Sequence, residues 1–261
     1  MGEGHKHLSG GLVRHLENGS SHTLAVDAQS GRDGPTLVWF NGFKSDMTGT
    51  KASELADWAS LIPRAFVRFD YMGHGASGGA FTDGTISLWR DDALAVIDEA
   101  TKGDLVLAGS SMGAWIATLA ALARPARVRA LVLVAPALDF TERLMWQSFD
   151  AATREAVMEK GVWHRPSPYS PDPYPITRAL IEDGRKHLLL DGPIGFSGPV
   201  RILQGMADAD VPHHHALLTA AQFGDADLRL ELVHDGDHRL SRSADLGRLC
   251  RMVRDTINLV S

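Results

Sequence analysis

The feature that most constrains the fold is an apolar run that stops at a glycine–serine turn and gives way at once to a helix-like segment. Residues 104–108 favour a strand, residues 109–113 read Gly-Ser-Ser-Met-Gly, and residues 114–123 are too long and too rich in Ala and Leu for a strand. A turn that lifts a serine out of a sheet brings the flanking backbone close, and glycine leaves room for that approach. The pattern therefore predicts a strand, a tight turn that carries Ser111, and a helix.

The glycine frame also chooses between two adjacent serines. Ser111 has glycine two positions before and after it, whereas Ser110 has alanine and methionine there. A serine hydroxyl is a weak nucleophile at neutral pH and needs a base, together with a group that orients the base. Ser111 is therefore the predicted nucleophile, and a carboxylate and a histidine are expected on later loops.

One predicted strand, residues 200–204, runs into a loop with two carboxylates. Asp208 stands three residues after the glycine that ends this strand and just before a Val-Pro pair, where loops of the form G-x-x-D-x-x-V-P carry the acid. Asp210 is interpreted as a solvated loop side chain. Asp208 is therefore the favoured acid, the group that holds the base in its orientation.

The next predicted strand, residues 228–233, runs into a loop with two histidines. His234 continues the alternating apolar face of this strand and is expected to pack at its end. His238 lies beyond a glycine, on a loop that can lean over the sheet toward Ser111. His238 is therefore the favoured general base.

Backbone amides are expected to hold the oxyanion that acyl transfer creates. Met112 directly follows the predicted nucleophile, so its N–H is one donor. The second donor is assigned to the N–H of Phe43, in the Asn-Gly-Phe turn after the predicted strand 36–40. Each such donor typically lowers the reaction barrier by about 3–4 kcal/mol.

Strand and helix patterns alternate along the rest of the chain. After a predicted hairpin around Asn18 and Gly19, strands are expected at 36–40, 65–69, 104–108, 130–135, 200–204 and 228–233, with helices at 50–61, 86–101, 112–123, 214–223 and 244–259. This alternation predicts an α/β fold in which a mostly parallel sheet has helices on both faces.

The alternation breaks once, between residues 135 and 199, where about 60 residues replace a connection of roughly 2–6 residues plus one helix. A helix over 141–160 that stops at Gly161, a proline-rich stretch and a second helix over 176–190 predict a cap over 139–196, on a core of 1–138 and 197–261. The candidates for an apolar acyl pocket are Trp146, Phe149, Trp163, Tyr169 and Tyr174. For each of them, packing of the cap onto the core is the competing interpretation.

Composition and charge exclude several classes of partner. The 261 residues carry a net charge of −6 and no basic run, which argues against nucleic acid or an anionic membrane surface. No apolar stretch approaches the roughly 20 residues of a membrane span, and the N-terminus has no signal-peptide core, so a cytoplasmic protein is expected. The single cysteine, Cys250, falls on the apolar stripe of the last predicted helix and is expected to be a core thiol.

Three further patterns suggest other chemistry, and each has a simpler explanation. Residues 73–78 spell G-x-G-x-x-G, but glycines and a threonine prolong the loop where a dinucleotide fold would begin its helix. The three histidines 213–215 point in different directions, so a solvated helix start is expected in place of a metal site. Asp70 precedes Ser111 and is expected to hydrogen-bond the glycine-rich turn. Neither a cofactor nor a metal is predicted.

Several of these motifs together resemble the abhydrolase domain-containing protein ten group. They include Asn-Gly-Phe at 41–43, Gly-Thr-Lys-Ala at 49–52, Asp-Tyr-Met-Gly-His-Gly at 70–75, the serine turn and Asp-His-Arg at 237–239, and the resemblance covers nearly the whole chain after residue 35. It implies an α/β-hydrolase that acts on acyl thioesters of proteins and on acyl glucuronides, with Ser111, Asp208 and His238 as its triad. Animal members are mitochondrial, but the acidic, short N-terminal segment does not carry that location over.

The predicted function is the hydrolysis of a carboxylic ester or thioester through an acyl-enzyme, without a cofactor. The substrate is expected to be a small molecule or an acylated protein with an apolar acyl group. A C–C bond hydrolase or lyase on the same fold is the enzymatic alternative, and a non-catalytic binding protein is the alternative from another class. The oligomeric state is left open.

Overall fold

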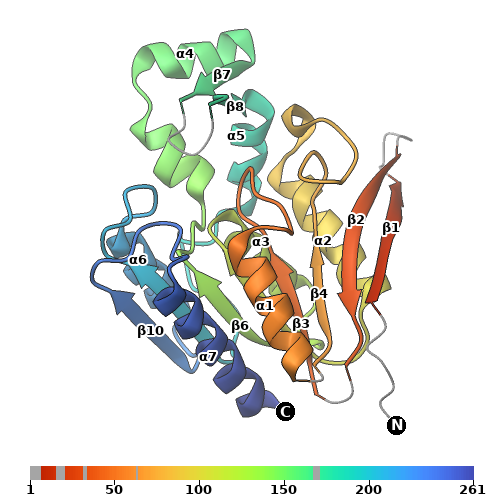
Figure 1. Cartoon of the computed structure of the whole chain (residues 1–261). Helices are drawn as coiled ribbons and strands as arrows, with labels where there is room; N and C mark the ends of the chain where they lie inside the picture. Colours follow the sequence, from red (N-terminus) through yellow and green to blue (C-terminus); the bar gives the residue numbers. More distant parts are fainter. Residues whose placement is uncertain (1–6, 16–20, 32–33, 63, 167–170) are drawn as a thin grey trace.

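The computed structural model describes residues 7–15, 21–31, 34–62, 64–166 and 171–261. In these ranges a twisted eight-stranded sheet runs through the molecule, with helices on both of its faces and further elements above one end (Figure 1). The strands follow the order β1-β2-β4-β3-β5-β6-β9-β10. The predicted α/β fold with a central, mostly parallel sheet is therefore confirmed.

The first strands of the sheet are antiparallel and the remainder are parallel. Strand β2 pairs antiparallel with both β1 and β4, whereas the pairs from β4 through β3, β5, β6 and β9 to β10 are all parallel. The strands are β1 (His7–His15), β2 (Ser21–Gln29), β3 (Thr36–Phe40), β4 (Phe66–Phe69), β5 (Leu105–Ser110), β6 (Val128–Val134), β9 (Val200–Gly205) and β10 (Leu228–Val233). The predicted Asn18-Gly19 turn lies outside the described residues.

Helices close the two faces of the sheet over separate hydrophobic cores. One face is covered by α1 (Thr50–Leu61) and α7 (Ser243–Val260), and the other by α2 (Ile86–Ala100), α3 (Met112–Ala123) and α6 (His213–Gln222). Central strands such as β5 are buried along their whole length, which explains their continuous apolar sequence. Cys250 is partly buried against the core below α1 and α7, as expected of a core thiol.

The segment between β6 and β9 forms the cap elements, which lie together above the sheet (Figure 1). They are η2 (Thr141–Met145), η3 (Trp146–Ser148), α4 (Ala151–Lys160), β7 (Val162–Arg165), β8 (Tyr174–Thr177), α5 (Arg178–Gly184) and η4 (Arg185–His187). Strands β7 and β8 form a separate antiparallel pair. The exact bounds of core and cap stay a prediction.

The prediction of a single helix over 141–160 is wrong. Phe149 is extended, and Asp150 then starts a new helix by accepting the Thr153 N–H with its side chain over 2.7 Å. Gly161 does end α4, with a left-handed φ of 80°. The second predicted helix, over 176–190, is shorter than expected because residues 174–177 pair as a strand before Thr177 caps α5.

None of the helices in the described ranges combines the length and the apolarity that crossing a membrane requires.

Candidate active site

Ser111 occupies a strained turn between β5 and α3. Its backbone has φ 57° and ψ −121°, a combination that residues with a side chain rarely adopt. Backbone hydrogen bonds hold the turn: Ser111 donates to the Val134 carbonyl over 2.9 Å, and its own carbonyl accepts from Ala114 and Ala137. A serine held in this way at a strand-to-helix turn is typical of a nucleophile elbow.

The glycines around Ser111 are required by close backbone contacts. A Cβ atom on Gly109 would lie 2.4 Å from the Gly113 carbonyl oxygen, and one on Gly113 would lie 2.2 Å from the Phe40 carbonyl oxygen. Neither contact is possible for a real side chain, so the close approach predicted for both glycines is confirmed. A Cβ atom on Gly42 would lie 3.4 Å from that of Ser111, which puts the loop after β3 beside the serine.

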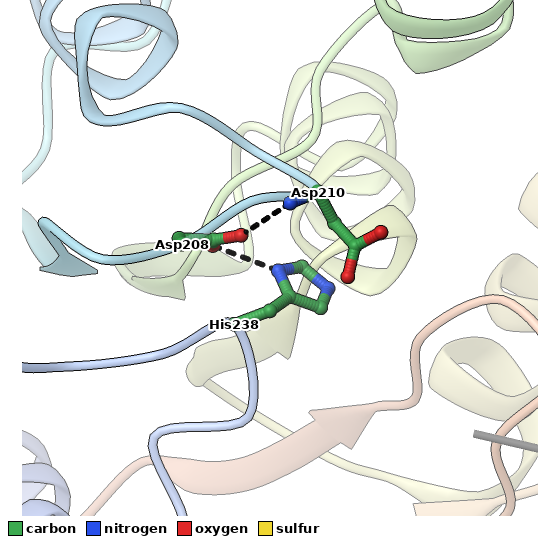
Figure 2. A group of neighbouring side chains, drawn as sticks. All are labelled: Asp208, Asp210 and His238. Carbon is green, nitrogen blue, oxygen red and sulfur yellow. Dashed lines mark hydrogen bonds and ion pairs between the residues drawn. The ribbon is translucent and has the colours of Figure 1, made fainter. Parts of the chain in front are cut away.

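The side chains of Asp208 and His238 meet across two neighbouring loops (Figure 2). His238 Nδ1 lies 2.8 Å from Asp208 Oδ2. The Asp208 side chain is fully buried, and its other oxygen accepts the backbone N–H groups of Asp210 and Val211 over 2.9 and 2.8 Å. A carboxylate fixed in this way keeps the Nδ1 proton of the imidazole toward itself and leaves Nε2 as the atom that accepts a proton.

Asp210 lies on the same loop but contacts the cap. Its half-buried carboxylate is 3.8 Å from the guanidinium of Arg165 in β7, so its interpretation as a solvated side chain is incomplete. Its carboxylate also lies beside the His238 ring, and ligand atoms of Asp208, Asp210 and His238 come within 4.8 Å of one another (Figure 2). Within this trio, the short contact from His238 Nδ1 to Asp208 is the arrangement of an imidazole oriented by a carboxylate for proton transfer.

His234 takes no part in this group, and the expectation that it packs at the strand end is wrong. The side chain is exposed in the turn that follows β10. The alternating inward face does not reach the end of the strand, because Leu232 is 39% exposed while Val233 is buried.

The loops that carry Asp208 and His238 are joined through their backbones. The Ala207 N–H donates to the Gly236 carbonyl over 2.9 Å, and the Met206 N–H donates to the Val233 carbonyl over 2.8 Å. A Cβ atom on Gly205 would lie 2.3 Å from the Gly236 carbonyl oxygen, so the backbones of the two loops are in contact at this point. The distance between acid and base is therefore fixed by main-chain packing.

One cavity of about 310 Å³ gathers these groups. Ser111 and His238 line it together with Phe43 and Met112, the residues assigned to the oxyanion hole. Among the described residues no hydrogen bond joins the side chains of Ser111 and His238. Part of the apolar lining comes from the residue before η2, from η2 and from β8: Phe140, Leu144, Met145 and Tyr174. The charged side chains that line the cavity are Lys44, Asp46, Lys51, Arg165, Asp210 and Arg239.

The loop after β3 is held by buried polar side chains. Asn41 accepts from the Trp39 indole over 2.8 Å and donates to the Phe69 carbonyl over 2.7 Å. His74 Nε2 accepts the Lys44 N–H over 3.2 Å, and burial lowers the pKa of His74 to about 4. The N–H next to Phe43 in the chain is therefore held by a neutral imidazole.

Asp70 organises the glycine-rich loop, as predicted. Its carboxylate accepts the Ala76 N–H over 2.9 Å and the Met47 N–H over 2.7 Å, and its carbonyl accepts from the Ser77 hydroxyl. Burial raises the pKa of this carboxyl, whereas its two backbone hydrogen bonds lower it. The loop over residues 73–78 thus joins the neighbouring loop after β3 and does not open a helix.

Comparison with known proteins assigns the family. Residues 35–173 match the family model described as serine aminopeptidase, S33. The human palmitoyl-protein thioesterase ABHD10, mitochondrial, is 36% identical over 228 residues, which cover 87% of this chain and 74% of that protein. The chain belongs to the ABHD10 family of α/β-hydrolases.

Two solved structures are similar to this chain over nearly its whole length. Mouse alpha/beta hydrolase domain-containing protein 10 superposes with a TM-score of 0.85 at 32% identity, covering 96% of this chain and all of that one, 100%. A hydrolase from Agrobacterium vitis S4 gives a TM-score of 0.93 at 42% identity, covering 97% and 99%. Membership in the ABHD10 family confirms the predicted α/β-hydrolase fold and the predicted class, a serine hydrolase of ester or thioester bonds.

The aromatic residues predicted for the pocket fall into two groups, according to whether they line the cavity. Tyr174 lines the cavity beside Phe43, with ring centroids 6.1 Å apart. Trp146, Phe149 and Trp163 do not line it within the described part of the chain; they pack on one another, with Phe149 and Trp163 at 5.2 Å. For these three partly buried side chains the structure favours the competing interpretation, packing of the cap, and Tyr169 lies outside the described residues.

The contacts of two polar residues were not anticipated from the sequence. His215 is buried with Nε2 2.8 Å from the Leu138 carbonyl, so the expected solvated start of α6 does not extend to this histidine. Lys51, the second residue of α1, lines the cavity and donates to the Arg239 carbonyl over 2.5 Å. No local pattern indicates either contact, since each joins segments that are distant in sequence.

Proposed function

We propose that the chain hydrolyses acyl esters or thioesters through an acyl-enzyme formed on Ser111, with His238 as the general base and Asp208 as the group that orients it. The observation that carries the proposal is the hydrogen bond between His238 Nδ1 and the buried Asp208 carboxylate, since His238 lines the same cavity as Ser111. Serine, imidazole and carboxylate are the parts that nucleophilic acyl transfer requires.

Each residue then has a defined step. His238 Nε2 takes the proton of the Ser111 hydroxyl as Ser111 attacks the acyl carbonyl carbon, and the imidazolium is stabilised by Asp208. The imidazolium returns the proton to the leaving alcohol or thiol. A water molecule, deprotonated by His238, then attacks the acyl-enzyme and releases the acid, with Ser111 regaining its proton.

The tetrahedral oxyanion is assigned to the backbone N–H groups of Phe43 and Met112. Met112 is the first residue of α3, so its N–H is among those that helix geometry leaves without an intrahelical acceptor. Gly42 brings the loop that carries Phe43 against Ser111. Both donors therefore come from segments that are held next to the nucleophile.

The acyl chain is assigned to the apolar side of the cavity. Phe140, Leu144, Met145 and Tyr174 line this side, and burial of each methylene of a substrate contributes about 0.8 kcal/mol. The name of the human relative, palmitoyl-protein thioesterase, supports a long acyl group on a thioester. The curated relatives are named mitochondrial, and the cytoplasmic location expected for this chain stays a prediction.

Labelling with a fluorophosphonate tests the nucleophile directly. We expect the wild-type protein and the Ser110→Ala variant to be labelled, and Ser111→Ala to be unlabelled, with a kcat lower by roughly 10⁴ to 10⁶. Ser110 is the matched control, because it is the adjacent residue and ends β5. Equal labelling of Ser111→Ala and wild type would show that another residue is the nucleophile.

A further inference from the structure

Lys51 connects the loop that carries Phe43, a proposed oxyanion donor, with the loop that carries His238, the proposed base. It follows the loop that carries Phe43, and its ammonium donates to the carbonyl of Arg239, the residue directly after His238. The side chain is half-buried and lines the same cavity as Ser111. The hydrogen bond from Lys51 to Arg239 thus joins the start of α1, which follows the loop that carries Phe43 (the oxyanion loop), to the loop that carries His238 (the base loop).

The base loop is a tight turn that depends on such contacts. Leu240 has a left-handed φ of 44° although it carries a side chain, and its N–H donates to the Asp237 carboxylate over 2.9 Å. The Arg239 carbonyl accepts from Lys51 and also from the Ser241 hydroxyl over 2.9 Å. His238 lies between Asp237 and Arg239, the two residues whose hydrogen bonds hold the loop, so a change at the Arg239 carbonyl moves the backbone of His238.

We propose that Lys51 is a positioning residue, whose ammonium holds the His238 loop at a fixed distance from the oxyanion loop and the serine turn. This inference rests on the proposed function, since it assigns a role to His238 in turnover. A hydrogen bond from a charged donor is roughly twice as strong as a neutral one, so loss of the Lys51 charge loosens the loop. A shift of about 1 Å in a catalytic group lowers the rate by as much as about 10²-fold.

The charge on Lys51 is sensitive to pH near 8. Burial, followed by the positive charge of Arg239, lowers the pKa of Lys51 to about 8, while Asp237 raises it. The charged groups that face this part of the cavity are Lys44 and Asp46 from the loop after β3, Asp210 from the acid loop, Arg165 from the cap, and Asp237, His238 and Arg239 from the base loop. Turnover is therefore expected to fall as pH rises through about 8.

The test is the pH profile of kcat and kcat/KM between about pH 6.5 and 9.5 with 4-nitrophenyl octanoate. We expect the wild-type profile to fall on its alkaline side with an apparent pKa near 8. Lys51→Arg keeps its charge in this range, so it should stay within about threefold of wild type at pH 7 and lose the alkaline fall. Lys51→Met should lower kcat by about 10- to 100-fold with KM within about threefold, and without an alkaline fall.

Thermal unfolding separates positioning from a structural role. Lys51 is half-buried, and the Arg239 carbonyl keeps its hydrogen bond from the Ser241 hydroxyl in Lys51→Met, so this variant is expected to have a Tm close to that of wild type. Lys102→Met makes the same change on an exposed lysine just before β5 and should match wild type in every readout. If Lys51→Met does not fold, the Lys51→Arg profile decides.

An alkaline fall near pH 8 that persists in Lys51→Arg, or a wild-type kcat in Lys51→Met, would overturn the positioning role. A lower Tm in Lys51→Met, with kcat restored on cooling, would also overturn it in favour of a structural role. Fluorophosphonate labelling of the wild-type protein distinguishes these failures from failure of the proposed function, since it depends on Ser111 and not on the pH profile of Lys51.

Discussion

His74 makes the stability of the protein depend on pH in a way that can be calculated. The side chain is 4% exposed, and its two ring nitrogens face the Met72 carbonyl and the Lys44 N–H, both at 3.2 Å. One nitrogen must donate and the other must accept, so the neutral ring is the form that fits. Burial accordingly lowers the pKa of His74 from 6.5 to about 4.

The sign follows from the two pKa values. Because the folded pKa of His74 lies below the unfolded one, the unfolded chain binds a proton that the folded chain does not between about pH 6.5 and 4. The stabilising contribution is complete above pH 6.5, decreases as the pH falls from 6.5 to 4, and is fully lost below 4. At 1.36 kcal/mol per pKa unit, the free energy of unfolding decreases by about 2 kcal/mol at pH 5 and about 3 kcal/mol at pH 4.

The assay compares wild type with His74→Gln by urea unfolding at pH 7.5, 6 and 5. A glutamine amide can donate and accept at this position but does not titrate, so the variant lacks the His74 contribution. Other titrating groups act equally in both proteins and cancel in the difference. We expect wild type to lose about 2 kcal/mol more than the variant between pH 7.5 and 5. The same loss in both proteins would refute the reasoning.

Three further outcomes test the site. Asp208→Asn should lower kcat at least about 10³-fold and Asp210→Asn less than about tenfold in steady-state assays; comparable losses would mean that the acid is misassigned. Gly113→Ala puts a Cβ atom 2.2 Å from the Phe40 carbonyl oxygen, so its free energy of unfolding should fall by about 1–3 kcal/mol, and an unchanged urea midpoint would contradict the packing. From acetyl to octanoyl esters, kcat/KM should rise up to about fourfold per buried methylene; acetyl esters as the best substrates would exclude the apolar acyl site.

The central fold is predictable from the sequence because its constraints are local. The strand before Ser111, the glycines on either side of it and the helix after it each have a strong sequence pattern, and the structure has all three. The loops after β9 and β10 are likewise marked by the glycines and carboxylates that follow apolar runs. Asp208 and His238 could be chosen for this reason, and the structure brings them within 2.8 Å.

The cap is less predictable because its structure depends on contacts between distant residues. Helical propensity continues through Phe149, but Trp146 and Phe149 pack against the rest of the cap, and the guanidinium of Arg185 lies over the Trp146 ring at 4.9 Å. Strand β8 contains a proline, which argues against a strand in sequence terms but is tolerated in a short two-stranded pair. The contact between Lys51 and Arg239 spans 188 positions and has no sequence signature.

The abutting backbones of Gly205 and Gly236 have a consequence for how enzymes of this kind diversify. Because the two loops are in main-chain contact, a substitution at either glycine displaces both loops, so the position of one cannot change independently of the other. The elements between β6 and β9 carry the apolar lining contributed by Leu144, Met145 and Tyr174, and they meet the acid loop at Arg165 through a side chain. Insertions and exchanges in that segment can therefore change which acyl groups are accepted while the spacing of acid and base is inherited unchanged.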